Sequence, residues 1–211
     1  MICVSLANME YEECLQFTVR ESLVEFRFDL LDIGPSRVIS LVSKAKRCIS
    51  TCRQGGMSEQ NRFLILQTAL EAGSNYIDFD LESDLDFMKE LIPTARSKGC
   101  DVILSFHDYQ KTPQAEELDH IVRSACEAGA DIVKVACLVN KTDDIVNLLN
   151  LYRNKFRMLV GGMGEKGLIT RVAATMLGAE FTFASAGEGR ETAPGQISKD
   201  KLVSIIRQIK E

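Results

Sequence analysis

The feature that most constrains this chain is a regular alternation of short β-like runs with amphipathic helical stretches along its whole length. Runs rich in valine, isoleucine and phenylalanine recur about every 25 residues, which is the length of one strand–helix unit. There are eight such runs, at residues 2–6, 24–30, 48–53, 76–81, 102–107, 132–137, 157–162 and 181–185. The alternation predicts a parallel sheet whose strands are connected by helices.

The stretches between these runs carry apolar residues at helical spacing. Helices are predicted at 61–72, 113–128 and 143–152, where apolar side chains recur every three or four residues. Gly73, Gly99 and Gly129 each follow a helical stretch and precede a β-like run, as glycines that end helices do. The glycines therefore mark helix ends that agree with the helical spacing of the apolar residues.

Eight strand–helix units are the number that closes into a (β/α)8 barrel of the TIM type. The chain has 211 residues, which suits one large core, and no linker-like stretch divides it. We therefore expect a single (β/α)8 domain over residues 1–211. A doubly wound open sheet is the alternative, although it would more typically use five or six strands at this length.

Composition excludes several classes of protein. The net charge of −5 argues against nucleic acid or an anionic membrane as the main partner, and no apolar run is long enough to span a membrane. The first residues do not resemble a signal peptide. Seven cysteines without a C-x-x-C pair, and only two histidines, read as reduced cytoplasmic thiols without a metal site. We expect a cytoplasmic protein.

Charged residues lie inside the strands themselves. Because residues two apart on a strand share a face, the polar side chains group together and must point away from the covering helices. Buried charges are costly unless they pair with one another or with a ligand, so these groups predict a polar active site. A self-contained ion network is the other interpretation. The groups are Glu25, Arg27 and Asp29; Thr51 and Arg53; Asp78 and Asp80; Ser105 and His107; and Ile132, Lys134 and Ala136.

Lys134 and His107 are the sharpest candidates for chemistry. Lys134 lies mid-strand among β-branched residues, where poor hydration favours the neutral amine that attacks carbonyls, although pairing with Asp78 or Asp80 is also possible. His107 ends a strand, where barrel enzymes keep their catalytic groups. His120 lies in a charged helical stretch, and we expect it to be solvated.

Two late segments carry glycine. Residues 160–167 lead into a helix that contains Arg171, and residues 193–196 read Ala-Pro-Gly-Gln before the last helix. A cation beside a late barrel loop favours a carboxylate or phosphate ligand there. Gln196 is predicted either to close over a ligand from this loop or only to cap the final helix.

In their order along the chain, these motifs resemble the type I 3-dehydroquinate dehydratase family. The resemblance covers essentially the whole chain and implies a (β/α)8 barrel, usually a homodimer, that needs neither metal nor cofactor. The implied reaction converts 3-dehydroquinate to 3-dehydroshikimate and water, the third step of the shikimate pathway. The motifs are Glu25-Phe-Arg27-Phe-Asp29, Thr51-Cys-Arg53 before Gly55-Gly56, Asp78-Phe-Asp80, Ser105-Phe-His107-Asp108, Val133-Lys134-Val135, Gly161-x-Met163-Gly164 with Arg171, and Ala193-Pro194-Gly195-Gln196.

The resemblance also implies roles for individual residues. Lys134 would form a Schiff base with the substrate ketone, and His107 would act as general base and then as general acid. Arg171 would clamp the carboxylate, and Thr192 and Gln196 would close over the substrate. The residues that would bind the substrate hydroxyls are Glu25, Arg27 and Arg53.

This chain departs from the family pattern at two positions. Gln54 stands where a glutamate is common before the glycine pair, and Asp80 stands where a glutamate is more usual.

Two other functions remain open at this point. A class I aldolase-like barrel acting on a phosphosugar would also use a strand lysine and a late glycine loop. An inactive barrel serving as a binding protein is the non-enzyme alternative.

Overall fold

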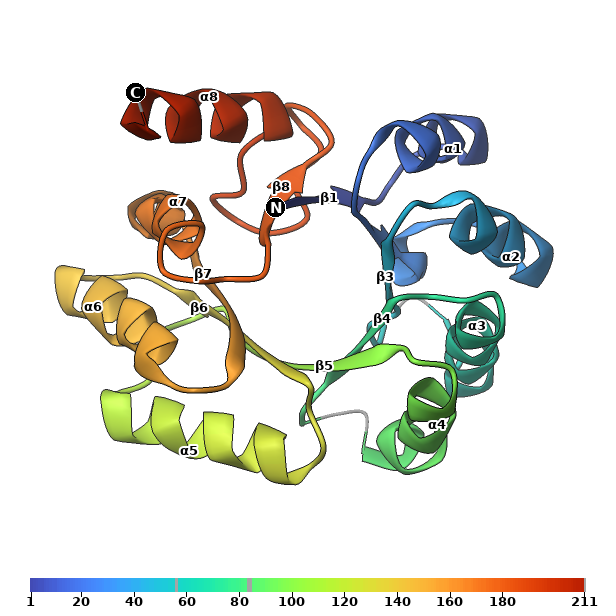
Figure 1. The fold of residues 1–211 in the computed structure, drawn as a ribbon, viewed down its shortest axis with the longest axis horizontal. Helices are drawn as coiled ribbons and strands as arrows, with labels where there is room; N and C mark the ends of the chain where they lie inside the picture. The colour runs from blue at the N-terminus through green and yellow to red at the C-terminus, as the bar shows by residue number, and fades with distance from the viewer. Residues whose placement is uncertain (56, 83–84, 211) are drawn as a thin grey trace. The chain divides into compact units, whose positions relative to one another are not determined.

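A computed structural model describes residues 1–55, 57–82 and 85–210. Gly56, one of the predicted glycine pair, lies outside these residues. The described strands form one eight-stranded sheet in the order β7-β6-β5-β4-β3-β2-β1-β8 (Figure 1). They are β1 (Ile2–Leu6), β2 (Val24–Arg27), β3 (Cys48–Thr51), β4 (Tyr76–Asp80), β5 (Asp101–Asp108), β6 (Ile132–Leu138), β7 (Arg157–Met163) and β8 (Thr182–Ser185).

Helices connect the successive strands. The α-helices are α1 (Tyr11–Arg20), α2 (Pro35–Lys44), α3 (Glu59–Glu71), α4 (Leu85–Ser97), α5 (Ala115–Glu127), α6 (Thr142–Asn150), α7 (Leu168–Ala174) and α8 (Lys199–Lys210). Short 3-10 helices are η1 (Phe28–Leu30), η2 (Leu151–Arg153) and η3 (Glu165–Gly167).

The order of the strands decides between the two predicted architectures. A doubly wound sheet reverses its strand order at a switch point, whereas here β1 to β7 follow one another and β8 joins β1. β8 also contacts β7, the strand that precedes it in the sequence. This is the order of a (β/α)8 barrel, so the predicted fold class is confirmed.

Two compact units make up the chain: a first unit, Val4–Leu104, and a second unit, Met1–Cys3 with Ser105–Glu211. In the first unit the strands pair in parallel, and the register places Arg27 beside Thr51 and Thr51 beside Asp78. Ser5 lies beside Glu25 in the same way. Helices α1 to α4 pack each against the next. The register therefore brings polar side chains from neighbouring strands into common rows.

Two strands of the first unit end earlier than predicted. The run 24–30 is a strand only to Arg27, after which η1 begins, so Asp29 does not share a strand face with Glu25. The run 48–53 is a strand only to Thr51, so Arg53 follows the strand end. In both places side-chain contacts described below replace the strand pairing that would have continued.

Helix α3 shows where periodicity alone misleads. It begins at Glu59 rather than at residue 61, behind an N-cap in which the Ser58 hydroxyl accepts from the Asn61 N–H at 3.3 Å. Leu64, one of the apolar residues at helical spacing in the range 61–72, is 47% exposed, whereas Arg62 is completely buried. The buried stripe of α3 thus begins with an arginine.

In the second unit, β6 and β7 pair in parallel along their whole length, from Ile132 beside Arg157 to Leu138 beside Met163. The Thr182 N–H donates to the Met1 carbonyl at 3.1 Å, which joins the start of β8 to the N-terminal residues. A small apolar core fixes α7 and α8 against β8. Its buried members are Val172, Ala184, Ile197 and Leu202.

No helix in the described part of the chain has both the length and the apolar character that crossing a membrane would require.

Candidate active site

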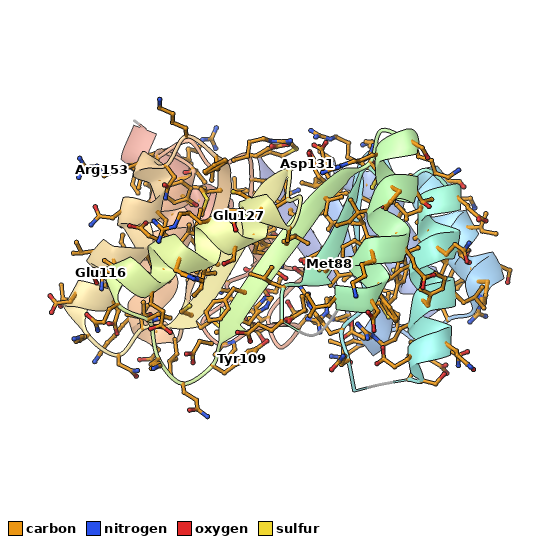
Figure 2. All side chains as sticks on the ribbon, turned by 90° about the horizontal axis from the view of Figure 1, so that it is seen from below. Met88, Tyr109, Glu116, Glu127, Asp131 and Arg153 are labelled. Carbon is orange, nitrogen blue, oxygen red and sulfur yellow. The ribbon has the colours of Figure 1, made fainter. Side chains whose placement is uncertain are left out.

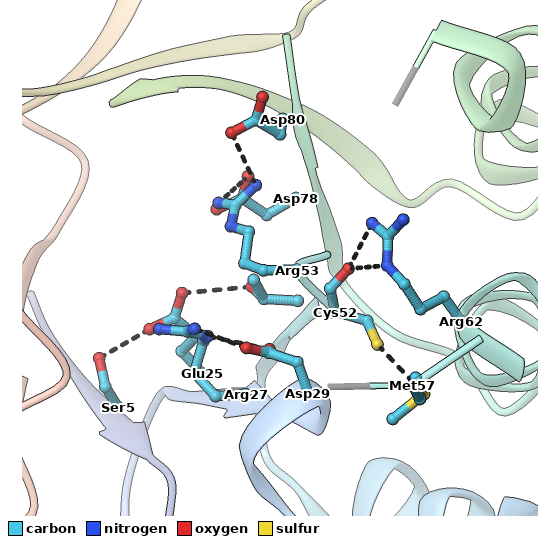
Figure 3. A network of polar contacts seen from close by, with 11 residues as sticks. Ser5, Glu25, Arg27, Asp29, Cys52, Arg53, Met57, Arg62, Asp78 and Asp80 are labelled. Carbon is cyan, nitrogen blue, oxygen red and sulfur yellow. Dashed lines mark hydrogen bonds and ion pairs between the residues drawn. The ribbon is translucent and has the colours of Figure 1, made fainter. Parts of the chain in front are cut away.

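Glu25 is the centre of a buried polar group in the first unit (Figure 3). The Ser5 hydroxyl donates to Glu25 Oε2 at 2.7 Å, and the Thr51 hydroxyl donates to Glu25 Oε1 at 3.2 Å. All three residues are at most 3% exposed. The hydroxyls on both sides hold the carboxylate in one orientation on β2, as binding a ligand at a defined position requires.

Arg27 pairs with Asp29 through two parallel hydrogen bonds. Arg27 Nε donates to Asp29 Oδ1 at 3.0 Å and Nη2 donates to Oδ2 at 2.6 Å, a bidentate geometry. The tight turn of η1 brings the carboxylate back to the guanidinium, which explains why the strand ends at this point. Desolvation lowers the pKa of Arg27, but the Asp29 hydrogen bonds and the Glu25 charge outweigh it, so the pKa is raised. Arg27 stays a cation.

Arg53 is held by two aspartates of β4. Its Nη2 lies 2.8 Å from Asp78 Oδ1, and its Nη1 lies 4.0 Å from Asp80 Oδ2 (Figure 3). Desolvation lowers the pKa of Arg53, but the charges of Asp78 and Asp80 outweigh it and raise the pKa. Within the described residues neither buried Nη has an acceptor beyond these two carboxylates. The arginine is thus anchored by charge while its donors suit a hydroxyl oxygen.

Sequence reasoning missed one buried arginine near this group. Arg62 donates from Nε and Nη2 to the Cys52 carbonyl at 3.1 and 2.8 Å, and Cys52 directly precedes Arg53. A signal was available, because Arg62 lies three and four residues before Ile65 and Leu66 on the apolar stripe of α3. A charge at the head of an apolar stripe indicates a buried, partnered side chain.

Lys134 occupies the middle of β6 in the second unit. The strand alternates, with Val133, Val135 and Cys137 buried and Lys134 on the half-buried face. The Lys134 ammonium lies 4.4 Å from the centre of the Phe183 ring on β8, a cation–π distance. The lysine therefore lies over an aromatic ring of β8, on the face of β6 opposite to Val133 and Val135.

His107 lies near the carboxyl end of β5, also in the second unit. Its imidazole stacks parallel to the ring of Tyr109, with the ring centres 6.1 Å apart. Tyr109, labelled in Figure 2, directly follows the last residue of β5, and Glu116 lies in the first turn of α5. The histidine thus occupies a strand end that leads into a helix start, where barrel enzymes place catalytic groups. His120 is exposed on α5, as predicted.

Arg171 is a buried cation without a countercharge among the described residues. It is 5% exposed, and its Nε has no hydrogen-bond partner in the described chain. Desolvation lowers the pKa of Arg171 to about 10. Its Nη1 lies 3.8 Å from the position that a Cβ on Gly161 would occupy, so the side chain reaches back over β7. Such a guanidinium favours a carboxylate or phosphate ligand.

The glycines after β7 are required by close backbone contacts. A Cβ on Gly167 would lie 2.4 Å from the Gly162 carbonyl carbon, so only glycine lets this turn pack on the strand. The Thr170 hydroxyl accepts from the Gly162 N–H at 2.7 Å and donates to the Gly167 carbonyl at 2.6 Å. These contacts fix the start of α7 and with it the direction of Arg171.

The segment after β8 brings Thr192 and Gln196 together. Gln196 Oε1 accepts from the Thr192 N–H at 2.7 Å and from its hydroxyl at 3.1 Å. Gly195 has φ of +74°, and a Cβ there would lie 2.4 Å from the Gly164 carbonyl oxygen. The Gly164 N–H donates to the Pro194 carbonyl at 3.1 Å. The late segment is thus fastened to the turn after β7.

The cysteines of the described residues are mostly buried. Six of the seven cysteines are buried, and burial raises the pKa of Cys14 and of Cys137 to about 12, so both thiols stay protonated. No group of three or more histidine, cysteine or acidic side chains within the described ranges could hold a metal ion.

Comparison with known proteins gives a consistent result. The family model for type I 3-dehydroquinase matches residues 2–211. The chain is 32% identical to the 3-dehydroquinate dehydratase of Methanocaldococcus jannaschii, with 98% of each protein covered. Among solved structures, the 3-dehydroquinate dehydratase of Aquifex aeolicus VF5 superposes with a TM-score of 0.85 at 24% identity, covering 99% of this chain and 98% of that one. That of Geobacillus kaustophilus HTA426 also gives 0.85, at 22% identity, with coverage of 99% and 90%.

Proposed function

Because the chain belongs to the type I 3-dehydroquinase family, we propose that it converts 3-dehydroquinate to 3-dehydroshikimate and water through a Schiff base on Lys134. The family is one of hydro-lyases, and membership decides against both the phosphosugar aldolase and the inactive binding protein. We also propose that residues 1–211 form one catalytic domain and that the protein is a homodimer in the cytoplasm. Its reaction would be the third step of the shikimate pathway.

The observation that carries the proposal is the buried guanidinium of Arg171, whose Nε has no hydrogen-bond partner within residues 1–55, 57–82 and 85–210, in the same unit as Lys134 and His107. The substrate of this reaction is a carboxylate that also bears a ketone. A buried cation supplies the countercharge that the carboxylate needs, and a strand lysine supplies the amine that the ketone needs. Arg171 would therefore bind the carboxylate, Lys134 would react with the ketone, and His107 would transfer the proton.

The chemistry follows from these groups. The Lys134 amine adds to the ketone carbon, and water leaves to give an iminium. His107 then takes a proton from the adjacent carbon, and the electron pair moves into the iminium to form a neutral enamine. The enamine expels the β-hydroxyl as water, with His107 returning the proton. Hydrolysis of the conjugated iminium releases the product and restores the lysine.

The remaining candidates bind and orient the substrate. Glu25 and Arg27 have hydrogen-bonding atoms held by fixed partners, and Arg53 has buried donors, so all three suit substrate hydroxyls. Thr192 and Gln196 would close over the ring and keep water from the imine. Neither Gln54 nor Asp80 is assigned a catalytic role.

The test combines turnover with covalent trapping. The purified chain is incubated with 3-dehydroquinate and borohydride, digested and examined by peptide mass spectrometry. We expect one adduct, on the peptide that contains Lys134, and loss of turnover in Lys134→Ala. Lys141→Ala, which removes an exposed lysine, is the control. An adduct on another lysine, or turnover by Lys134→Ala at the normal rate, would overturn the proposal.

A further inference from the structure

Arg62 is among the largest completely buried side chains of the first unit, and no substrate contact has been assigned to it. Its guanidinium uses two of its nitrogens on one acceptor, the Cys52 carbonyl. The third nitrogen, Nη1, donates to both carboxylate oxygens of Glu59 at 3.0 and 2.8 Å. The guanidinium also lies 4.9 Å from the centre of the Phe87 ring on α4.

These contacts do not amount to a simple stabilising ion pair. Glu59 is 60% exposed in its side chain, so its charge contributes little to the stability of the fold. An apolar residue of similar size at the head of the α3 stripe would avoid the desolvation of a charge. Unlike an apolar residue, the arginine directs two N–H donors at one backbone carbonyl.

That carbonyl belongs to the peptide that leads into Arg53. A peptide unit is planar, so fixing the Cys52 carbonyl also fixes the N–H and the Cα of the next residue. This happens just beyond the end of β3, where strand pairing no longer holds the backbone. At its other end the Arg53 side chain is held by Asp78 at 2.8 Å. Arg53 is therefore fixed through its backbone by Arg62 and through its head by β4 (Figure 3).

We infer that Arg62 is a positioning residue that orients Arg53 for the substrate by clamping the Cys52 carbonyl. The inference rests on the proposed function, in which Arg53 binds a substrate hydroxyl. Arg62 touches no substrate itself. Its fork of donors matters more than its charge, because lysine offers a point charge that cannot hold one carbonyl from two sides.

The experiment is a double-mutant cycle on steady-state kinetics with 3-dehydroquinate. Arg62→Lys is expected to raise KM about tenfold with little change in kcat, because ground-state orientation is lost and the chemical groups are intact. Arg53→Met alone is expected to raise KM as well. In the Arg53→Met background, Arg62→Lys should then have no further effect on KM. Glu59→Gln, which leaves both donors on Cys52, is the control and should keep the normal KM.

The outcomes separate the possibilities. Additive effects of Arg62→Lys and Arg53→Met, or a lower melting temperature with unchanged KM, would show that Arg62 only stabilises α3. If Arg62→Lys does not fold, Arg62→Gln, which keeps an amide donor but not the fork of two donors, takes its place in the same cycle with Arg53→Met. A wild-type chain without turnover of 3-dehydroquinate would overturn the proposed function and this inference with it. Normal wild-type turnover with additive effects would overturn only the role of Arg62.

Discussion

The Lys134 ammonium nitrogen lies 4.4 Å from the centre of the Phe183 ring, so an aromatic face on β8 covers the amine that projects from β6. Cation–π contacts of this kind contribute about 0.5–2 kcal/mol, according to how far water is excluded. Phe183 itself meets Phe181 edge to face, with ring centres 5.5 Å apart. Phe181 therefore helps to hold the Phe183 ring that contacts the lysine.

Replacing Phe183 should weaken the placement of the lysine. Phe183→Leu keeps an apolar side chain but removes the ring face, so we expect kcat/KM and the rate of borohydride inactivation to fall about 2- to 30-fold. Phe183→Tyr keeps the ring and should restore most of both. Phe156→Leu, at an exposed ring, is the control. Equal rates for the leucine and tyrosine variants would show that the ring does not place the lysine.

Removing His107 should separate imine formation from proton transfer. General acid–base help contributes about 10²–10⁴-fold for a proton transfer, so His107→Ala should lose at least that in kcat. The amine of Lys134 remains, so borohydride should still trap an adduct. His120→Ala, which removes the exposed histidine of α5, should turn over normally. A His107→Ala enzyme with near-normal kcat would exclude the histidine from the mechanism.

Arg171 should show opposite effects on activity and stability. Burial lowers its pKa to about 10, so at neutral pH the folded chain holds a poorly solvated cation. Arg171→Met removes that cation and should raise the melting temperature of the ligand-free enzyme by a few degrees. It should also lower kcat/KM about 10- to 150-fold, the range for a lost charged hydrogen bond.

The pH dependence of Arg171 follows from the same shift. Because its folded-state pKa lies below that of the unfolded chain, its contribution destabilises the fold at neutral pH, and the destabilisation fades as pH rises above about 10. A bound carboxylate supplies a countercharge to this cation. It should raise the melting temperature of the wild-type enzyme more than that of Arg171→Met. Arg123→Met, at an exposed arginine of α5, should respond to the ligand like wild type. Equal ligand shifts in all three proteins would contradict the carboxylate clamp.

The segment after β8 can be tested through Gln196 and Gly195. Gln196→Ala should lower kcat/KM about 5- to 30-fold, the range for one or two lost hydrogen bonds, with little change in melting temperature. Gly195→Ala forces a Cβ to within 2.4 Å of the Gly164 carbonyl oxygen and should lower both activity and stability. Gln16→Ala, exposed on α1, is the control. A Gln196→Ala enzyme that loses stability but keeps kcat/KM would make this segment scaffolding.

Much of the fold could be predicted because the signals are local. A strand turns alternate residues to opposite faces, so the face of Lys134 follows from its neighbours alone, and the strand–helix alternation fixes the fold class. The end of β2 could not be predicted in this way. Phe28 continues the alternation of the strand, yet the backbone turns into η1, where Asp29 bonds back to Arg27.

The sequence by itself determined the (β/α)8 order, the strand positions of Lys134 and His107, and the glycine-bearing segments at 160–167 and 193–196. Only the tertiary structure decided which charges are paired. The structure pairs Arg53 with Asp78, leaves Arg171 Nε without a hydrogen-bond partner among the described residues, and buries Arg62 against the Cys52 carbonyl. The physical reason is that periodicity depends on neighbours in the chain, whereas the burial and pairing of a charge depend on groups brought together from distant elements.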